Sequence, residues 1–241
     1  MTRPDPTTLY AVVDATWPAA AKQTVGPWII RDGQGGGSRV SAATAARPVT
    51  PDAIDMAAGA MRALGQTPLF MIRESDTALD QMLDDAGYVI KDPVTMYAAP
   101  VDVIATQRPP AVTTFQVWPP LAVQAEVWAQ GGIGPGRISV MDRAPHPKTT
   151  LLGRLNDRPA GTVYVGIAQG CAMIHALEIA PGHRRQGLAQ HLTRAAAFWG
   201  RDHGAEYLTL VTTTANAAAN TLYASLGMMV VGHYHYRTLK E

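Results

Sequence analysis

The sequence has little cysteine, little net charge and no long apolar run. Cys171 is the only cysteine among 241 residues, so neither an intrachain disulfide nor a thiolate zinc cage can form. The 20 Lys plus Arg residues nearly balance the 19 Asp plus Glu residues, so bulk charge attracts neither nucleic acid nor an anionic membrane. Apolar runs of about 18 residues and an apolar export signal are both absent. We therefore expect a cytoplasmic protein without nucleic-acid or membrane partners.

The rest of the amino-acid composition is typical of a folded chain with many turns. Hydrophobic residues make up 47% of the sequence, and it contains 22 glycines and 18 prolines. The pair Pro109-Pro110 separates two apolar stretches, which predicts a linker there. We expect two domains, residues 1–105 and 111–241.

Strands and helices are predicted to alternate along both halves, which indicates an α/β protein. In the first half we expect helices over 7–16, 51–64 and 75–86, and strands over 28–31, 39–42, 69–73 and 88–90, the first two forming a hairpin around the glycines of 33–37. In the second half we expect helices over 121–128, 188–203 and 216–226, a loop over 131–136, and strands over 149–155, 160–168, 173–179, 207–211, 228–231 and 233–238.

An internal repeat is indicated when Gly87 is laid on Gly227, an offset of 140 residues. Each glycine ends an amphipathic helix that lies between two apolar strands. The alternative is that any two strand–helix–strand units align at a shared helix-ending glycine. In this register Asp76 falls on Asn216, Asp80 on Asn220, Met82 on Leu222 and Leu83 on Tyr223.

The stretch after the strand 173–179 predicts an anion site. The strand ends at Pro181, a loop carries Arg184 and Arg185, and Gly187 opens a helix. Backbone N–H groups at a helix start lack intrahelical partners and can bind phosphate. A nucleotide P-loop is excluded because Leu188-Ala189 stand where Lys and Ser or Thr are needed. The remaining alternative is a plain strand-to-helix turn with surface arginines.

This stretch and a later element resemble the acyl-CoA-binding core of the GNAT superfamily of N-acetyltransferases. Residues 184–189, Arg-Arg-Gln-Gly-Leu-Ala, match the family pattern R/Q-x-x-G-x-G/A, and Asn216, Asn220 and Tyr223 match its N-x-x-x-N-x-x-Y element. The likeness is strong over residues 149–238. Trp17-Pro18-Ala19 followed by residues 28–31 resembles the start of N-terminal halves in some bacterial two-domain members. The resemblance implies the GNAT fold, a mixed central sheet flanked by helices, in two tandem halves of which only the C-terminal one is complete.

The resemblance also implies an activity, which is transfer of acetyl from acetyl-CoA to a primary amine by direct attack in a ternary complex. The acceptor would be a small-molecule or peptide amine, and a homodimer is common in the family. Tyr223 would protonate the leaving thiolate, and the backbones of Leu177 and Ile179 would hold the pantetheine arm. The alternative for Tyr223 is a half-buried tyrosine with a structural hydrogen bond. The residues expected to bind the coenzyme are Leu177, Ile179, Arg184, Arg185, Gln186, Gly187, Leu188, Ala189, Asn216, Asn220 and Tyr223.

Two residues are candidates for the general base that the amine requires. Glu178 is the first candidate, although a salt-bridged strand carboxylate is an equal reading. His175 is the second candidate, although a lone histidine on a strand is more often structural. His233 and His235 share a strand face without a further metal ligand nearby in sequence, so we expect no metal site. Cys171 is expected to be a small apolar filler.

The first half lacks the features that would bind a coenzyme. Its counterpart of the phosphate loop, residues 44–49, has one arginine and no glycine, and Leu83 replaces the tyrosine. We predict that this half binds no coenzyme and instead walls or orients the acceptor site of the second half. Two alternatives stay open: the halves complete each other's sheets, or the whole chain is a non-catalytic acyl-CoA or small-ligand sensing module.

Overall fold

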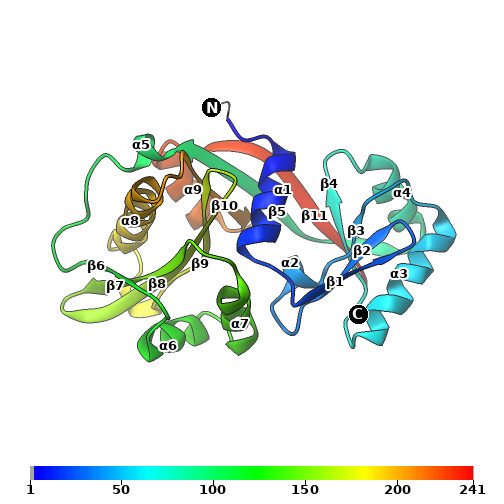
Figure 1. The fold of residues 1–241 in the computed structure, drawn as a ribbon, viewed down its shortest axis with the longest axis horizontal. Helices are drawn as coiled ribbons and strands as arrows, with labels where there is room; N and C mark the ends of the chain where they lie inside the picture. The colour runs from blue at the N-terminus through cyan, green and yellow to red at the C-terminus, as the bar shows by residue number, and fades with distance from the viewer. Residues whose placement is uncertain (1–2, 241) are drawn as a thin grey trace. The chain divides into compact units, whose positions relative to one another are not determined.

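The structure, a computed structural model, describes residues 3–240 and divides them into two compact units (Figure 1). Unit 1 comprises residues 3–18, 96–212 and 216–231, and unit 2 comprises 19–95, 213–215 and 232–240. These units differ from the expected ranges 1–105 and 111–241, which stay a prediction. The differences arise because the first helix joins the C-terminal unit and two long strands, β5 (Tyr88–Pro100) and β11 (Met229–Leu239), are each divided between the units.

Unit 1 contains a mixed sheet with the strand order β5-β10-β9-β8-β7-β6. Strands β6 to β9 pair in antiparallel fashion, and β9 pairs with β10 in parallel. Its elements are α1 (Pro6–Thr16), α5 (Val101–Ile104), β6 (Thr114–Val117), α6 (Ala122–Gln130), α7 (Pro135–Arg143), β7 (Lys148–Leu155), β8 (Arg158–Ala168), β9 (Cys171–Ile179), the 3-10 turn η1 (Pro181–His183), α8 (Leu188–Asp202), β10 (Tyr207–Thr213) and α9 (Ala217–Ser225).

The two faces of this sheet differ in chemistry because side chains alternate along each strand. Val163, Val165 and Ile174 belong to an apolar core that also contains Leu192 of α8. The other face is packed by α1 and α6 and carries buried polar side chains. Thr150, Thr162 and His175 come from the sheet, and Thr16 of α1 and Gln124 of α6 hydrogen-bond to them.

Unit 2 has a three-stranded antiparallel sheet and a second strand pair. The first sheet consists of β1 (Ala21–Val25), β2 (Trp28–Asp32) and β3 (Thr44–Ala45), and the pair is β4 (Leu69–Arg73) with β11. Helices α2 (Ser38–Ser41), α3 (Pro51–Ala63) and α4 (Thr77–Asp85) complete the unit. The core centres on Trp28, whose ring lies 5.0 Å from that of Phe70 and whose Nε1 donates to the carbonyl of Ala53.

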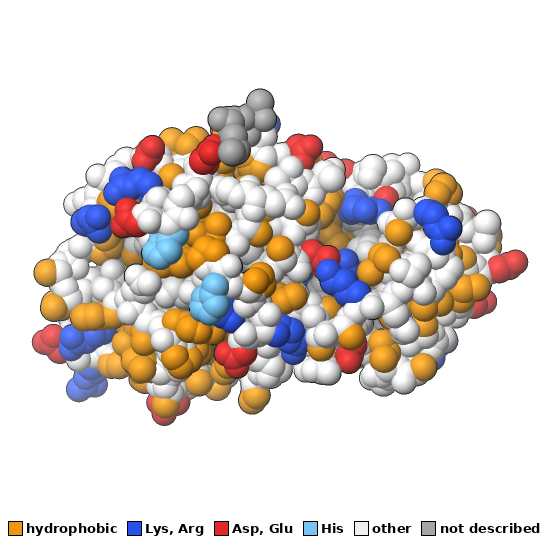
Figure 2. Space-filling model, in the orientation of Figure 1, with side chains coloured by type: hydrophobic (Ala, Val, Ile, Leu, Met, Phe, Trp, Pro, Cys, Tyr) orange, Lys and Arg blue, Asp and Glu red, His pale blue; other side chains and the backbone are white. Residues whose placement is uncertain are grey.

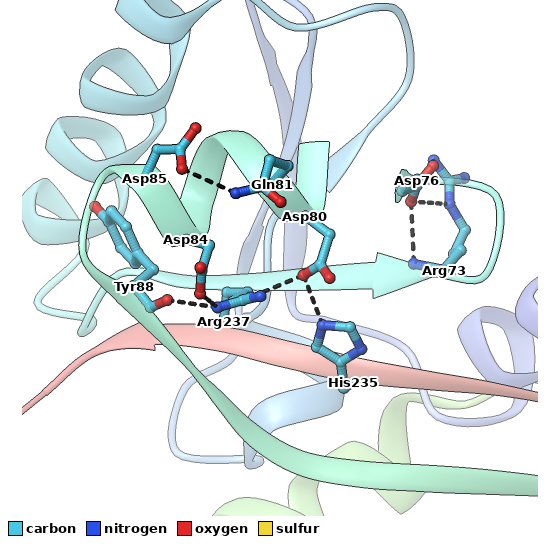
Figure 3. A network of polar contacts seen from close by, with 9 residues as sticks. All are labelled: Arg73, Asp76, Asp80, Gln81, Asp84, Asp85, Tyr88, His235 and Arg237. Carbon is cyan, nitrogen blue, oxygen red and sulfur yellow. Dashed lines mark hydrogen bonds and ion pairs between the residues drawn. The ribbon is translucent and has the colours of Figure 1, made fainter. Parts of the chain in front are cut away.

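Polar side chains of α4 and β11 form an ionic network in unit 2 (Figure 3). The guanidinium of Arg237 is buried and donates to Asp80, to Asp84 and to the carbonyl of Tyr88. His235 contacts the same oxygen of Asp80 at 2.8 Å. The last strand of the chain therefore fixes a helix that lies about 150 residues earlier.

Several predicted elements need correction. Residues 39–42 are not a strand, because 38–41 form the helix α2, and the hairpin partner of β2 is the exposed strand β1. The expected loop 131–136 is cut short by α7, which has a proline in its first turn. The two expected C-terminal strands are one strand, β11. The other predicted helices and strands are present with shifted ends.

Charged side chains on the face seen in Figure 2 are scattered among polar and hydrophobic ones, with both signs interspersed. This distribution agrees with the formal net charge of +1. Among residues 3–240, none of the helices combines the length and the apolar character that crossing a membrane requires.

Candidate active site

Strand β9 leaves its neighbour β10 in the middle of the sheet. The pairing runs from Cys171–Tyr207 to Ile174–Leu210, so His175–Ile179 lie beyond the paired segment. On the other side β9 pairs with β8 through a register shift, where Tyr164 faces His175 and Thr162 faces Glu178. Ala176 within this bulge has a φ of 50°, and its carbonyl accepts from Nε1 of Trp128 at 2.7 Å. Such bulges redirect strands beside active sites.

The loop after β9 presents an exposed helix start. Gly187 is the N-cap of α8 with a φ of 82°, a conformation that disfavours any other residue. A Cβ added there would come no nearer than 4.0 Å to His191, so the backbone is open to a ligand. The first turn of this 15-residue helix carries no acidic residue that would repel an anion. Arg184, Arg185 and Gln186 are all exposed beside it.

Not every side chain of this loop is available to bind a ligand. Leu188 is buried, and a Cβ added to Gly153 or to Gly161 would touch its side chain. Only the backbone N–H of Leu188 can therefore face a ligand. Gln186 contacts the carbonyl of Gly182 across the loop. Arg184 uses Nε to donate to the carbonyl of Ile179 at 3.0 Å.

Glu178 is held in place by two neighbours. Its Oε1 accepts from Nη2 of Arg184 at 3.1 Å, and its side chain is 17% exposed. A Cβ on Gly131 would lie 2.4 Å from the carboxylate, so the end of α6 approaches Glu178 closely. The ion pair with Arg184 thus occupies the carboxylate that would serve as the general base.

Helix α9 carries the second predicted element. Asn216 is its N-cap and accepts from the N–H of Ala219. Asn220 donates to the carbonyl of Asn216 at 2.8 Å and accepts from the hydroxyl of Tyr97 at 2.9 Å. Tyr223 is 5% exposed, its ring lies 5.9 Å from that of Tyr97, and burial raises the pKa of its hydroxyl above its ordinary value. At neutral pH Tyr223 therefore keeps its proton and can act as an acid.

His175 lies at the last paired position of β9 before the bulge. It is 2% exposed, contacts Oγ1 of Thr16 through Nε2 at 2.8 Å, and stacks on Trp17 at 4.9 Å. Sequence reasoning missed Thr16 and Tyr97, because their partners lie more than 120 residues away and no local pattern marks them. The only sequence signal for Tyr97 was the 140-residue offset, which aligns Tyr97 with Arg237.

The remaining candidate residues lie outside this arrangement. Cys171 is buried, and burial aided by the charge of Glu206 raises the pKa of its thiol to about 11, which disfavours the reactive thiolate. His235 belongs to the Asp80 network in unit 2. Within residues 3–240, the structure shows no group of three or more His, Cys, Asp or Glu side chains that could hold a metal ion.

The splayed strand, the open helix start after it and the buried tyrosine form the arrangement expected of an acyltransferase. Residues 114–228 match the acetyltransferase (GNAT) family, which supports assigning this part of the chain to the GNAT superfamily of N-acetyltransferases. The family uses acyl-CoA donors.

Relatives and solved structures extend this likeness over almost the whole chain. The chain is 24% identical over 239 residues to the uncharacterized N-acetyltransferase YobR of Bacillus subtilis (strain 168), covering 92% of this chain and 94% of the relative. A GCN5-related N-acetyltransferase from Kribbella flavida superposes with a TM-score of 0.74 at 19% identity over 97% of this chain and 95% of the other. A tandem GNAT protein from the clavulanic acid biosynthesis pathway superposes with a TM-score of 0.62 at 14% identity over 98% and 89%. The two superpositions establish the fold.

Proposed function

We propose that the chain transfers the acetyl group of acetyl-CoA to a primary amine of a small molecule or peptide. The observation that carries this proposal is the separation of β9 from β10 directly before the Gly187-capped start of α8. A pantetheine arm would complete the free edge of β9 through the backbones of Leu177 and Ile179. The pyrophosphate would then reach the N–H groups of residues 187–189 and the guanidinium groups of Arg184 and Arg185.

In the proposed reaction the amine attacks the thioester carbon within a ternary complex. A bond forms between nitrogen and the acetyl carbon, and the carbonyl becomes an oxyanion. The bond from carbon to sulfur then breaks, and Tyr223 donates its proton to the departing thiolate. Asn216 and Asn220 would contact the coenzyme from α9. The proton lost by the amine goes to a general base, for which Glu178 and His175 are the candidates.

Calorimetric titration of acetyl-CoA tests the binding part of this proposal. We expect one site in the wild-type chain and no detectable binding to Gly187→Glu, which places a carboxylate where the pyrophosphate would lie. Gly204→Glu is the matched control, because Gly204 at the other end of α8 has the same φ of 82° and open space around a Cβ. Equal loss in both variants, or wild-type protein without binding, would contradict the proposed site.

Turnover is tested separately from binding. Release of free thiol from acetyl-CoA is followed in the presence of a panel of primary amines, including polyamines, amino sugars and peptide N-termini. Thiol release that depends on an amine supports transfer. Tight binding at one site without release for any amine would point to the sensing module instead.

A further inference from the structure

Arg184 is tied to the end of strand β9 by one edge of its guanidinium group. Its Nε donates to the carbonyl of Ile179 at 3.0 Å, and its Nη2 donates to Oε1 of Glu178 at 3.1 Å. These two N–H groups lie side by side in the planar fork, so both contacts use the same edge. The other edge, formed by Nη1 and the second N–H of Nη2, meets no acceptor among residues 3–240, and the side chain is 55% exposed. That edge can bind an anion through two parallel hydrogen bonds.

Glu178, in turn, lies against the end of helix α6. A Cβ added to Gly131 would come within 2.4 Å of Oε2 and 2.7 Å of Cγ of Glu178. Gly131 is the C-cap of α6 and has a φ of −90°, a backbone conformation that other residues also adopt. The missing side chain at Gly131 therefore matters for the space that it leaves to Glu178, and the backbone conformation by itself does not call for glycine.

From these contacts we propose that Glu178 is a positioning residue that holds Arg184 with its open edge toward the pyrophosphate of the coenzyme, and that Gly131 provides the space for it. This inference rests on the proposed acetyl transfer and does not depend on which residue takes the proton of the amine. It extends the coenzyme site beyond the loop 184–189 to a strand carboxylate and to the end of α6.

An arginine that is fixed in advance binds the coenzyme at a lower entropic cost. A free arginine side chain loses rotamer freedom when a ligand immobilises it, which weakens binding by about 2- to 12-fold in Kd. Arg184 has already lost this freedom to its two acceptors. The charge of Glu178 acts in the opposite direction, because a carboxylate near the pyrophosphate repels it. The test must therefore separate the position of Arg184 from the charge of Glu178.

Two variants of Glu178 separate the two effects. Glu178→Gln and Glu178→Ala both remove the negative charge, but only glutamine keeps a side-chain oxygen that can accept from Arg184. In calorimetric titrations we expect acetyl-CoA to bind Glu178→Ala about 3- to 10-fold more weakly than Glu178→Gln. Equal Kd values for the two variants overturn the inference.

Gly131→Ala tests the position of Arg184 while the charge of Glu178 is kept. The added methyl group must displace the carboxylate, so we expect the Kd for acetyl-CoA to rise about 3- to 10-fold. Gly134→Ala is the matched control, because Gly134 has a similar φ of −86° and a Cβ there would meet nothing within 4 Å. Equal Kd values for Gly131→Ala and Gly134→Ala overturn the inference.

A double variant shows whether Gly131 acts through Arg184. In Arg184→Met, Arg185 and the start of α8 remain to bind the coenzyme, and adding Gly131→Ala should leave the Kd unchanged. A general disturbance of the fold would weaken binding with or without the arginine, so a further loss in the double variant overturns this inference alone. A wild-type chain that binds no acetyl-CoA overturns the proposed function as well. The wild-type titration thus tells the two failures apart.

Discussion

Arg237 on β11 donates through Nε to Oδ1 of Asp80 on α4 over 2.7 Å, although 157 residues separate them. The 140-residue offset places this pair on Tyr97 and Asn220, which are joined by a hydrogen bond of 2.9 Å in the other unit. Asp80 and Asn220 are each the fourth residue after the N-cap of their helix. Each of them is bonded to the strand that follows the helix of the other copy. This correspondence supports duplication and the reading in which each half completes the other.

Replacing Arg237 by Met should destabilise the fold through unit 2. The substitution leaves Asp80 and Asp84 facing each other without their shared cation. A buried pair broken on one side costs about 3–5 kcal/mol, and because the carboxylates are partly exposed we expect a loss nearer 2 kcal/mol. Urea unfolding followed by circular dichroism measures it. Arg154→Met removes a pair whose acidic partner is 93% exposed, and it should change stability by less than about 0.5 kcal/mol.

The same network predicts an acid-sensitive contribution to stability. Burial alone would raise the pKa of Asp80, but hydrogen bonds from Arg237 and His235 outweigh it and leave the pKa below its ordinary value of 3.8. Because the pKa of Asp80 is lower in the folded state than in the unfolded state, its charge stabilises the fold at pH values above the pKa of the unfolded state. This contribution is lost as the pH falls through the pKa of the folded state.

The stability of the wild type and of Asp80→Asn should therefore differ most near neutral pH and converge as the pH falls through the lowered pKa of Asp80. Thermal unfolding measured at several pH values gives the two curves. A difference that stays constant down to the lowest pH would show that the charge of Asp80 does not contribute.

Local sequence signals predicted much of unit 1 and less of unit 2. Helix α8 was predicted because apolar residues recur at helical spacing between Gly187 and Gly204. Strand β1 was missed because all but one of its residues are exposed and it lacks an apolar alternation. The helix α7 was missed because glycines before Pro135 suggested a loop.

The candidate site was predictable only where it follows from contiguous residues. The loop 184–189 and the element with Asn216 and Tyr223 are readable because neighbouring residues act together. The ion pair of Glu178 with Arg184 spans six residues and agrees with the salt-bridged reading of that carboxylate. The contacts of Thr16 and Tyr97 depend on tertiary packing across 159 and 123 residues, which no local pattern encodes.

Removing the hydroxyl of Tyr97 should cost more than removing that of Tyr164. Tyr97→Phe deletes the bond to Asn220, whose amide then loses a partner, and we expect a loss of about 1 kcal/mol. Tyr164→Phe deletes a buried hydroxyl that bonds to no described residue, and it should be neutral or stabilising. Chemical unfolding of both variants measures the difference, and a larger loss for Tyr164→Phe would show that its hydroxyl is satisfied in solution.

Replacing Tyr223 by Phe tests the acid in the proposed reaction. The ring keeps its packing against the apolar core, so acetyl-CoA should bind with nearly unchanged Kd, while kcat falls about 100-fold because the thiolate leaves unprotonated. Since burial raises the pKa of Tyr223, the wild-type rate should show no fall from this residue between about pH 7 and 10. An alkyl thioester with a better leaving thiol should partly rescue the variant, because such a thiolate needs less protonation. Equal slowing with both thioesters would assign Tyr223 a packing role and move the acid elsewhere.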